Sequence, residues 1–250
     1  DSEIHDIVPA DINGDGQMEI AVTGDALGAF WYEVPSDPTQ DGNWTRHTIT
    51  MDVLEDNDAI HSGFFPKGIG DLDGDGDADI VWPDRWLENR DAGQTWVEHS
   101  LPFGKRGPWG LSSRSWIIDL DGDGDNDIVA ADSDQTGSRV AWLENDGSDT
   151  PSFTAHMLPE EAPGTRGSFH SLAAEDFDND GDVDIFAVEQ EDTSIFPEGA
   201  TPRWYIWENV STADSIAFAE RVILDGRLGG HDAFATDVDG DGDVDIVSKI

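Results

Sequence analysis

The stretch DLDGDGDADI at residues 71–80 is one of five closely similar acidic phrases in this chain. The other four begin at Asp11 (DINGDGQMEI), Asp119 (DLDGDGDNDI), Asp176 (DFDNDGDVDI) and Asp237 (DVDGDGDVDI). Their carboxylates stand on alternate residues of a tight turn, where they repel one another unless a cation lies among them. Hard oxygen ligands in this pattern suit Ca²⁺. Because successive phrases start 60, 48, 57 and 61 residues apart, they also indicate a repeated structural unit.

The residues around each phrase predict four short strands per unit and no helix. An apolar stretch enters the acidic loop, a β-branched segment such as DIVW at residues 79–82 leaves it, and an aromatic strand and a last strand follow. The expected fold class is therefore all-β. The units are expected at residues 1–50, 51–102, 103–159, 160–224 and, incomplete, 225–250. One tryptophan recurs in each aromatic strand and is expected in the core: Trp31, Trp86, Trp142 and Trp207.

The phrase D-x-D-G-D-G-x-x-D-I entering a strand resembles the VCBS and FG-GAP-like repeats, which also occur in the calcium-bearing blades of integrin α-subunit propellers. The resemblance extends over nearly the whole chain. It implies a β-propeller of four-stranded blades, with calcium between the first and second strands of each blade. Propellers of this family usually have about seven or eight blades. Residues 1–250, with four full repeats and part of a fifth, are therefore expected to form one domain that belongs to a longer propeller.

Up to five structural calcium ions are expected, each held by the side chains at loop positions 1, 3, 5 and 9 and by the main-chain carbonyl at position 7. The side-chain ligands expected are Asp11, Asn13, Asp15 and Glu19; Asp71, Asp73, Asp75 and Asp79; Asp119, Asp121, Asp123 and Asp127; Asp176, Asp178, Asp180 and Asp184; Asp237, Asp239, Asp241 and Asp245. The carbonyl ligands expected are those of Gln17, Asp77, Asp125, Asp182 and Asp243. The first loop has one anionic ligand fewer and is expected to bind more weakly. An EF-hand is excluded because position 12 never carries its glutamate.

Composition excludes several classes of protein. Against 55 acidic residues the chain has 13 Lys and Arg and a formal charge of -42, which argues against a nucleic-acid partner. It has no cysteine for a disulfide scaffold and no apolar run long enough to span a membrane. The first residue, Asp1, is typical of a mature or excised start. Repeated calcium loops without cysteine favour an extracellular, secreted or periplasmic location.

The seven histidines fall into two groups. His47, His99 and His156 each lie three residues after an aromatic in the last strand of a unit, with Arg221 in the fourth copy, and are interpreted as structural. His5, His170 and His231 each precede the first loop aspartate by six residues, so they should ring the mouth of the channel opposite the calcium loops. His61 and Arg114 lie near the corresponding slots of the other units. These imidazoles either bind or catalyse, or hydrogen-bond a neighbouring blade; the sequence leaves both open.

The connectors between units gather cations and aromatics that are expected near the same mouth. The basic residues are Lys67, Lys105, Arg106, Arg114, Arg166 and Arg227; the aromatics are Phe64, Phe65, Trp109, Trp116 and Phe169. Cations beside aromatic platforms favour binding of carbohydrate, above all an anionic polysaccharide. The first alternative is a polysaccharide lyase or sugar dehydratase, for which the resemblance implies His170, His231, His5 or His61 as acid–base groups and Arg166, Arg114 or Lys67 as electrostatic partners. The second is a propeller for cell adhesion or another extracellular protein ligand.

Overall fold

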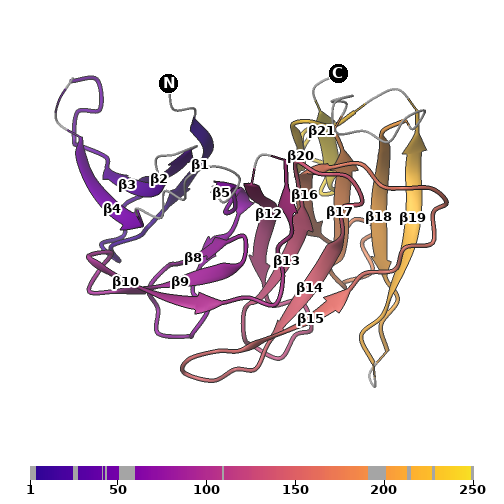
Figure 1. Cartoon of the computed structure of the whole chain (residues 1–250), viewed down its shortest axis with the longest axis horizontal. Helices are drawn as coiled ribbons and strands as arrows, with labels where there is room; N and C mark the ends of the chain where they lie inside the picture. The colour runs from indigo at the N-terminus through magenta and orange to yellow at the C-terminus, as the bar shows by residue number, and fades with distance from the viewer. Residues whose placement is uncertain are drawn as a thin grey trace.

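The computed structural model describes residues 4–24, 28–40, 42, 44–50, 60–108, 110–190, 201–212, 215–226 and 229–248. Within these residues it contains 21 β-strands and no helix (Figure 1). The all-β fold class expected from the repeats is confirmed. The sheets follow one another along the chain in a fan, with β1–β4 and β16–β19 on opposite sides of the view in Figure 1.

A run of four antiparallel strands in sequence order recurs in four sheets. In the first and second sheets these are β1 (Ile4–Ala10), β2 (Glu19–Gly24), β3 (Gly28–Glu33) and β4 (Thr45–Thr50), and β7 (Ile69–Gly70), β8 (Asp79–Trp82), β9 (Arg85–Arg90) and β10 (Thr95–Ser100). In the third and fourth they are β12 (Gly110–Ile118), β13 (Asp127–Asp132), β14 (Val140–Asn145) and β15 (Phe153–Met157), and β16 (Phe169–Glu175), β17 (Asp184–Glu189), β18 (Arg203–Asn209) and β19 (Phe218–Asp225). A last pair, β20 (Ala233–Thr236) and β21 (Asp245–Ser248), stands apart.

The inner strand of the second unit departs from the simple pattern of one continuous strand. It is divided into β5 (Ile60–Ser62), β6 (Pro66–Lys67) and β7, and both β5 and β6 pair in parallel with β12 of the next unit. With the short β11 (Arg106–Gly107), they extend the third sheet to seven strands. A Cβ atom at Gly68 would lie 2.0 Å from Ser115 Oγ, so glycine permits this close approach of neighbouring inner strands.

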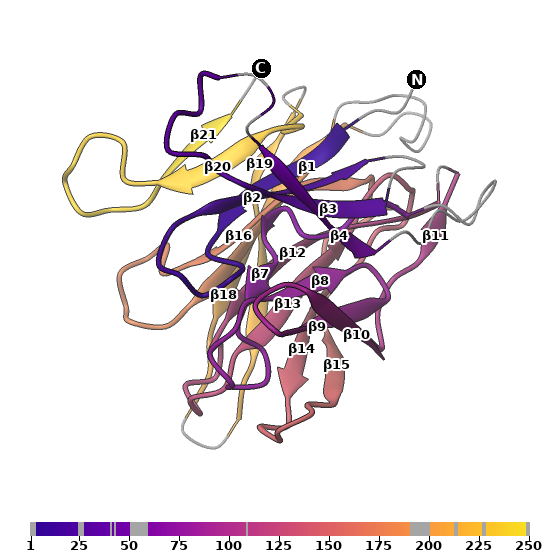
Figure 2. The same ribbon diagram turned by 90° about the vertical axis from the view of Figure 1, so that its left-hand side faces the viewer.

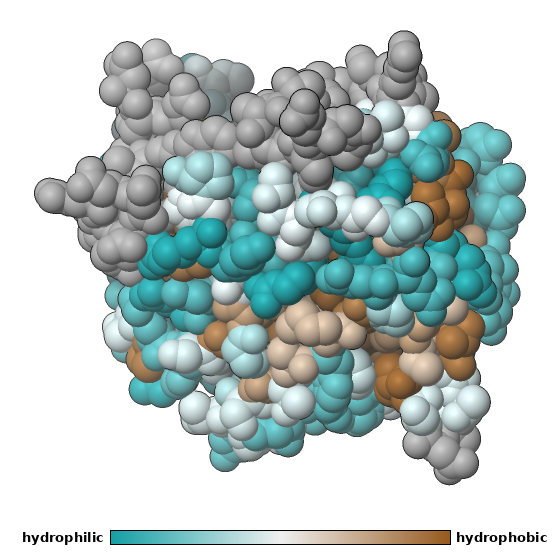
Figure 3. Space-filling model, turned by 45° about the vertical axis from the view of Figure 1, so that its right-hand side comes forward, coloured by the Kyte–Doolittle hydropathy of each residue, from teal (hydrophilic) through white to brown (hydrophobic). Residues whose placement is uncertain are grey.

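The hydrophobic core lies between successive sheets. One cluster joins Trp31 of the first sheet to Ile80 and Leu87 of the second. A second cluster packs the second sheet against the third, and a third cluster packs the third against the fourth and against β20. The four repeated tryptophans all belong to these clusters and are at most 5 % exposed, as expected. On the face drawn in Figure 3 the surface is largely hydrophilic, with separate hydrophobic patches.

A stacked Trp–His–Glu group recurs on the outer strands of the first three units. The ring centroids of Trp86 and His99 are 4.4 Å apart, and His99 Nε2 lies 2.7 Å from Glu88. His47 and His156 make the same stack and the same carboxylate contact in their units. In the fourth unit Arg221 Nη2 instead lies 2.8 Å from Glu208. The structural interpretation of this group of histidines is confirmed.

Candidate calcium loops and a histidine pocket

In four of the five acidic loops, three carboxylates can each offer an oxygen within 4.8 Å of the other two. The sets are Asp71, Asp73 and Asp79; Asp119, Asp121 and Asp123; Asp176, Asp178 and Asp184; and Asp237, Asp239 and Asp245. All belong to loop positions 1, 3, 5 and 9, where side-chain ligands were expected. In the first loop Asn13 interrupts the carboxylate series, and no such set occurs among its residues, all of which are described. The position-7 carbonyls remain a prediction.

Each loop is shaped by hydrogen bonds from its own backbone to these carboxylates. In the second loop Asp71 accepts the N–H of Gly76 at 3.1 Å, and Asp73 accepts the N–H of Asp75 at 3.2 Å. Gly76 has a φ of 95°, a left-handed conformation that suits glycine. The carboxylates of Asp71, Asp73 and Asp79 are thereby held so that an oxygen of each lies within 4.8 Å of the other two.

In the second, third and fourth loops the position-9 carboxylate is buried and clamps the loop to the third strand of the unit, whereas Asp245 of the fifth loop is exposed. Asp79 accepts the N–H groups of Leu72 and Asn89, both at 2.8 Å. Burial raises the pKa of Asp79 to about 8, against the opposing effect of these two backbone donors, and raises the pKa of Asp127 to about 6. A buried carboxylate whose charge is this unfavourable fits a site built to receive a cation, and the all-oxygen donor set fits Ca²⁺.

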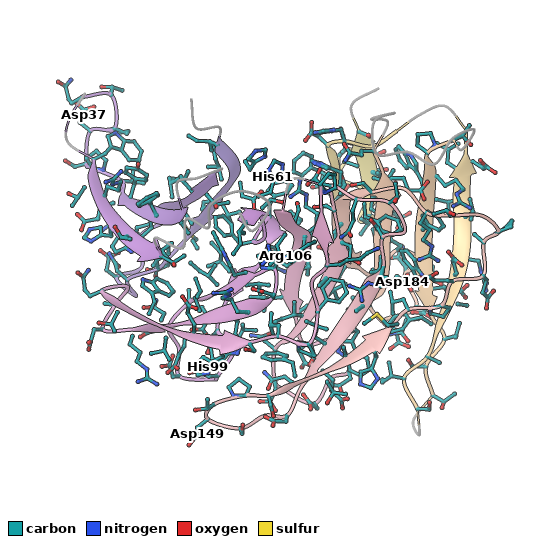
Figure 4. All side chains as sticks on the ribbon, viewed as in Figure 1. Asp37, His61, His99, Arg106, Asp149 and Asp184 are labelled. Carbon is teal, nitrogen blue, oxygen red and sulfur yellow. The ribbon has the colours of Figure 1, made fainter. Side chains whose placement is uncertain are left out.

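At the other end of the inner strands, three histidines predicted to meet do line one cavity. A pocket of about 430 Å³ is bordered by His5, His170 and His231, together with Arg114 and Phe65. His170 is the second residue of β16, and the opposite end of that strand leads into the loop at Asp176. His61 lies against His5, with ring centroids 3.7 Å apart and the ring planes tilted by 47°. In Figure 4 His61 lies in the upper part of the view, and Asp184, the position-9 residue of the fourth loop and the first residue of β17, lies below it.

Arg114 is the centre of a buried polar network behind this pocket. Its Nη1 donates to Ser62 Oγ at 2.7 Å and lies 3.5 Å from Asp6 Oδ1, and its Nε donates to the main-chain oxygen of His170 at 2.9 Å. Ser62 continues through Ser112 to the carboxylate of Asp134. The guanidinium charge is therefore neutralised within the protein.

The hydrogen bonds of His170 determine its tautomer. Nδ1 lies 3.0 Å from the main-chain oxygen of His231 and must donate to it, so Nε2 is left to accept from Arg114 Nη2 at 2.9 Å. Burial and the neighbouring Arg114 lower the pKa of His170, although Asp134, 3.5 Å away, opposes them. Both ring nitrogens are engaged, so His170 positions Arg114 and is not poised as a base. The ring of His231, 3.9 Å from that of His170, makes no hydrogen bond to the described residues.

A second cavity of about 480 Å³ adjoins the first and shares Ile7, Phe65 and Phe234 with it. It is mainly apolar, and Lys67 enters it with Nζ 5.0 Å above the ring of Trp116. Residues of β1, β6, β12, β16 and β20, one inner strand from each unit, line this cavity. Figure 2 shows β1 and β20, from the first and last units, in the same part of the molecule.

Several residues expected at the mouth lie elsewhere. Arg166 is buried away from the pocket, where it forms an ion pair with Glu220 and lies over the rings of Phe169, Tyr205 and Trp207. Phe64 and Phe169 are core residues. Lys105 donates to the main-chain oxygen of Thr136 at an exposed turn, and Arg106, in β11, does not line the pocket. Trp109 and Arg227 lie outside the described residues.

Sequence reasoning missed Asp6, Asp134 and Ser112. A signal for Asp6 was present, because His5–Asp6 and His231–Asp232 are the same dipeptide at the same place in their units. Asp134 has no such signal, since it follows β13 in a turn and meets His170 only through the packing of neighbouring units.

No described residue belongs to a helix that could cross a bilayer.

The comparisons with known proteins agree with the repeat structure. No curated protein matches the sequence. The family model of the FG-GAP-like repeat matches twice, over residues 119–187 and 176–248. These matches together cover just over half of the 250 residues. The chain therefore belongs to the FG-GAP-like repeat family.

Proposed function

We propose that this chain is a calcium-stabilised β-propeller module of a secreted or periplasmic protein and that it binds carbohydrate in the histidine pocket. Calcium is supported by the recurrent carboxylate sets and by the raised pKa values of Asp79 and Asp127. Propeller geometry is supported by the successive four-stranded units and by the five inner strands that line one cavity. The described strands form no closed sheet, so the proposed ring of seven or eight blades requires further units.

The observation that carries the carbohydrate proposal is the junction of a polar pocket with an aromatic one. His5, His231 and Asp232 border the polar pocket, while Phe65 and Trp116 offer apolar ring surfaces next to it. Sugars need both, because their hydroxyls require partners and their C–H faces stack on aromatic rings. The two cavities together have room for more than one sugar residue.

The charges around the pocket modify the expectation of an anionic ligand. Arg114 is matched by Asp6 and by Asp134, and Asp232 also borders the pocket. With the imidazoles neutral, the surroundings carry net negative charge, which disfavours a uronic acid. We therefore propose a neutral oligosaccharide as the preferred ligand.

A lyase or dehydratase is the second candidate, and it is favoured by the ring of His231, which makes no hydrogen bond to the described residues. This histidine is the acid–base candidate, since His170 is engaged through both nitrogens and Arg166 lies in the core. A protein ligand is the third candidate, in keeping with the interaction roles associated with FG-GAP-like repeats.

Calorimetric titration of the calcium-loaded protein with neutral and uronic oligosaccharides tests the proposal. We expect binding of a neutral oligosaccharide that weakens about tenfold or more in His231→Ala and Phe65→Ala. Asp149→Ala, in an exposed loop far from His61 in Figure 4, is the control. Equal binding by His231→Ala and the wild type, or no binding across the panel, would show that the pocket is not a sugar site. Ultraviolet absorbance of unsaturated products from uronic substrates would support the lyase instead.

A further inference from the structure

The side-chain amides of two asparagines connect the acidic loops of neighbouring units. Asn145 Nδ2 donates to the main-chain oxygen of Leu72, in the second loop, and to that of Asn126, in its own third loop, both at 2.8 Å. Asn89 Nδ2 donates to Ile12 of the first loop at 2.7 Å and to Ala78 of the second at 3.1 Å. Each amide thus shares its two N–H groups between two loops.

Each of these side-chain amides donates to a residue whose own N–H group donates to a position-9 carboxylate. Leu72 donates its N–H to Asp79 at 2.8 Å, and its oxygen accepts from Asn145. Asn145 in turn donates its own N–H to Asp127 at 2.8 Å. All four residues are buried, so water cannot easily substitute for a lost bond. An unbroken path therefore runs from one candidate ligand, Asp79, to the next, Asp127.

The first and second loops are joined in the same way. Glu19 accepts the N–H of Ile12 at 2.9 Å, Ile12 accepts from Asn89, and Asn89 donates its N–H to Asp79 at 2.8 Å. The second and third loops have an additional bridge, because Asn126 Nδ2 donates to the main-chain oxygen of Asp71 at 2.7 Å.

The fourth unit has an asparagine at the same repeat position, but among the described residues its side-chain amide does not reach the loop of the preceding unit. Asn209 ends β18 as Asn145 ends β14, and its N–H donates to Asp184 at 2.7 Å. Its side-chain amide donates to Val183, 3.1 Å away in its own loop, and to nothing in the third loop among the described residues. The chain therefore contains its own matched control at the same repeat position.

We propose that calcium binds cooperatively to the first three loops, with Asn89 and Asn145 as the coupling residues, and that the fourth loop binds independently of them. This inference rests on the proposed calcium binding. An ion held by Asp73 and Asp79 would fix Asp79 and, through it, the N–H of Leu72, whose oxygen accepts from Asn145. Leu72 then orients Asn145, which places Asp127 for the next ion. Binding at one loop thereby lowers the free energy needed to order its neighbour.

Calcium titration of ¹⁵N-glycine-labelled protein tests this loop by loop. The amides of Gly76, Gly124 and Gly181 report the second, third and fourth loops, because each donates to the position-1 aspartate of its loop. Asp73→Asn is expected to weaken calcium binding at the third loop by about fivefold or more, through Asn145, and to leave the fourth unchanged. Asn145→Ala should reduce this effect, and Asn145→Ala combined with Asn126→Ala should remove it.

Asn209→Ala is the control and should change only the response of Gly181. Asn145→Asp, which retains the oxygen that accepts from Gly147 but loses both donors, repeats the test if the alanine variant unfolds. Glycine signals that never respond to calcium would refute the proposed calcium binding itself. Normal calcium responses, with the third loop indifferent to Asp73→Asn, would retain the calcium sites and overturn the coupling.

Discussion

Without calcium, this protein should lose stability as the pH rises, which is the reverse of ordinary acid denaturation. The cause is the buried position-9 carboxylate, most clearly Asp79, whose pKa rises from the usual 3.8 to about 8 in the folded chain. Between these two values the folded state holds a proton that the unfolded state has released. The folded state binds more protons, so the free energy of unfolding falls with rising pH across that window.

The size of the effect follows from the raised pKa values of two loop carboxylates, Asp79 and Asp127. Between about pH 5 and about pH 7.5, Asp79 should remove about 3 kcal/mol of stability, at about 1.4 kcal/mol per pKa unit. Asp127, whose pKa rises from 3.8 to about 6, should remove about 1 kcal/mol more. The lowered pKa of His170 acts in the opposite direction below about pH 6.5 and offsets part of this sum. Bound calcium should abolish the loss, because the ion favours the ionised carboxylates and binds more tightly as they release their protons.

Denaturant unfolding followed by tryptophan fluorescence measures this directly. The metal-free protein, prepared on a chelating resin, is compared at about pH 5 and about pH 7.5 with the protein in millimolar calcium. Asp79→Asn should flatten most of the pH dependence of the metal-free protein while weakening its response to calcium. Metal-free wild-type protein that is equally stable, or more stable, at the higher pH would refute the reasoning.

Three further perturbations have expected outcomes. Arg166→Met should lower the free energy of unfolding by about 3–5 kcal/mol, because it leaves the buried carboxylate of Glu220 without its ion-pair partner. Adding Glu220→Gln should recover part of the lost stability in a thermal melt, and a double variant no more stable than the single variant would contradict this account. In calcium, the free energy of unfolding should fall as the pH drops below about 6.5, because the pKa of His170 is lowered in the folded state. The His170→Gln variant should show a smaller fall, and a pH profile identical to that of the wild type would exclude this cause. Trp86→Ala should destabilise by about 3–5 kcal/mol in chemical unfolding through loss of its buried stack with His99, whereas a change below about 1 kcal/mol would show that the site repacks.

The candidate site was partly accessible from sequence. A spacing of six residues from His170 to Asp176 corresponds to one inner strand, so it placed the histidines and the loops at opposite strand ends. The same argument failed for Arg166, because a connector position does not show whether a cation faces the channel or a neighbouring sheet. Its ion pair with Glu220 joins residues 54 positions apart, a separation that carries no local pattern.

Sequence alone determined the features that depend on short-range chemistry. Alternate carboxylates around a glycine define each acidic loop, and two-residue alternation with a recurrent tryptophan defines the strands and their buried faces. Only the tertiary structure decided how the units meet. The parallel pairing of β6 with β12, the tautomer of His170 and the bridge from Asn145 to Leu72 all join residues of different units. They depend on the packing of successive sheets, which local periodicity does not encode.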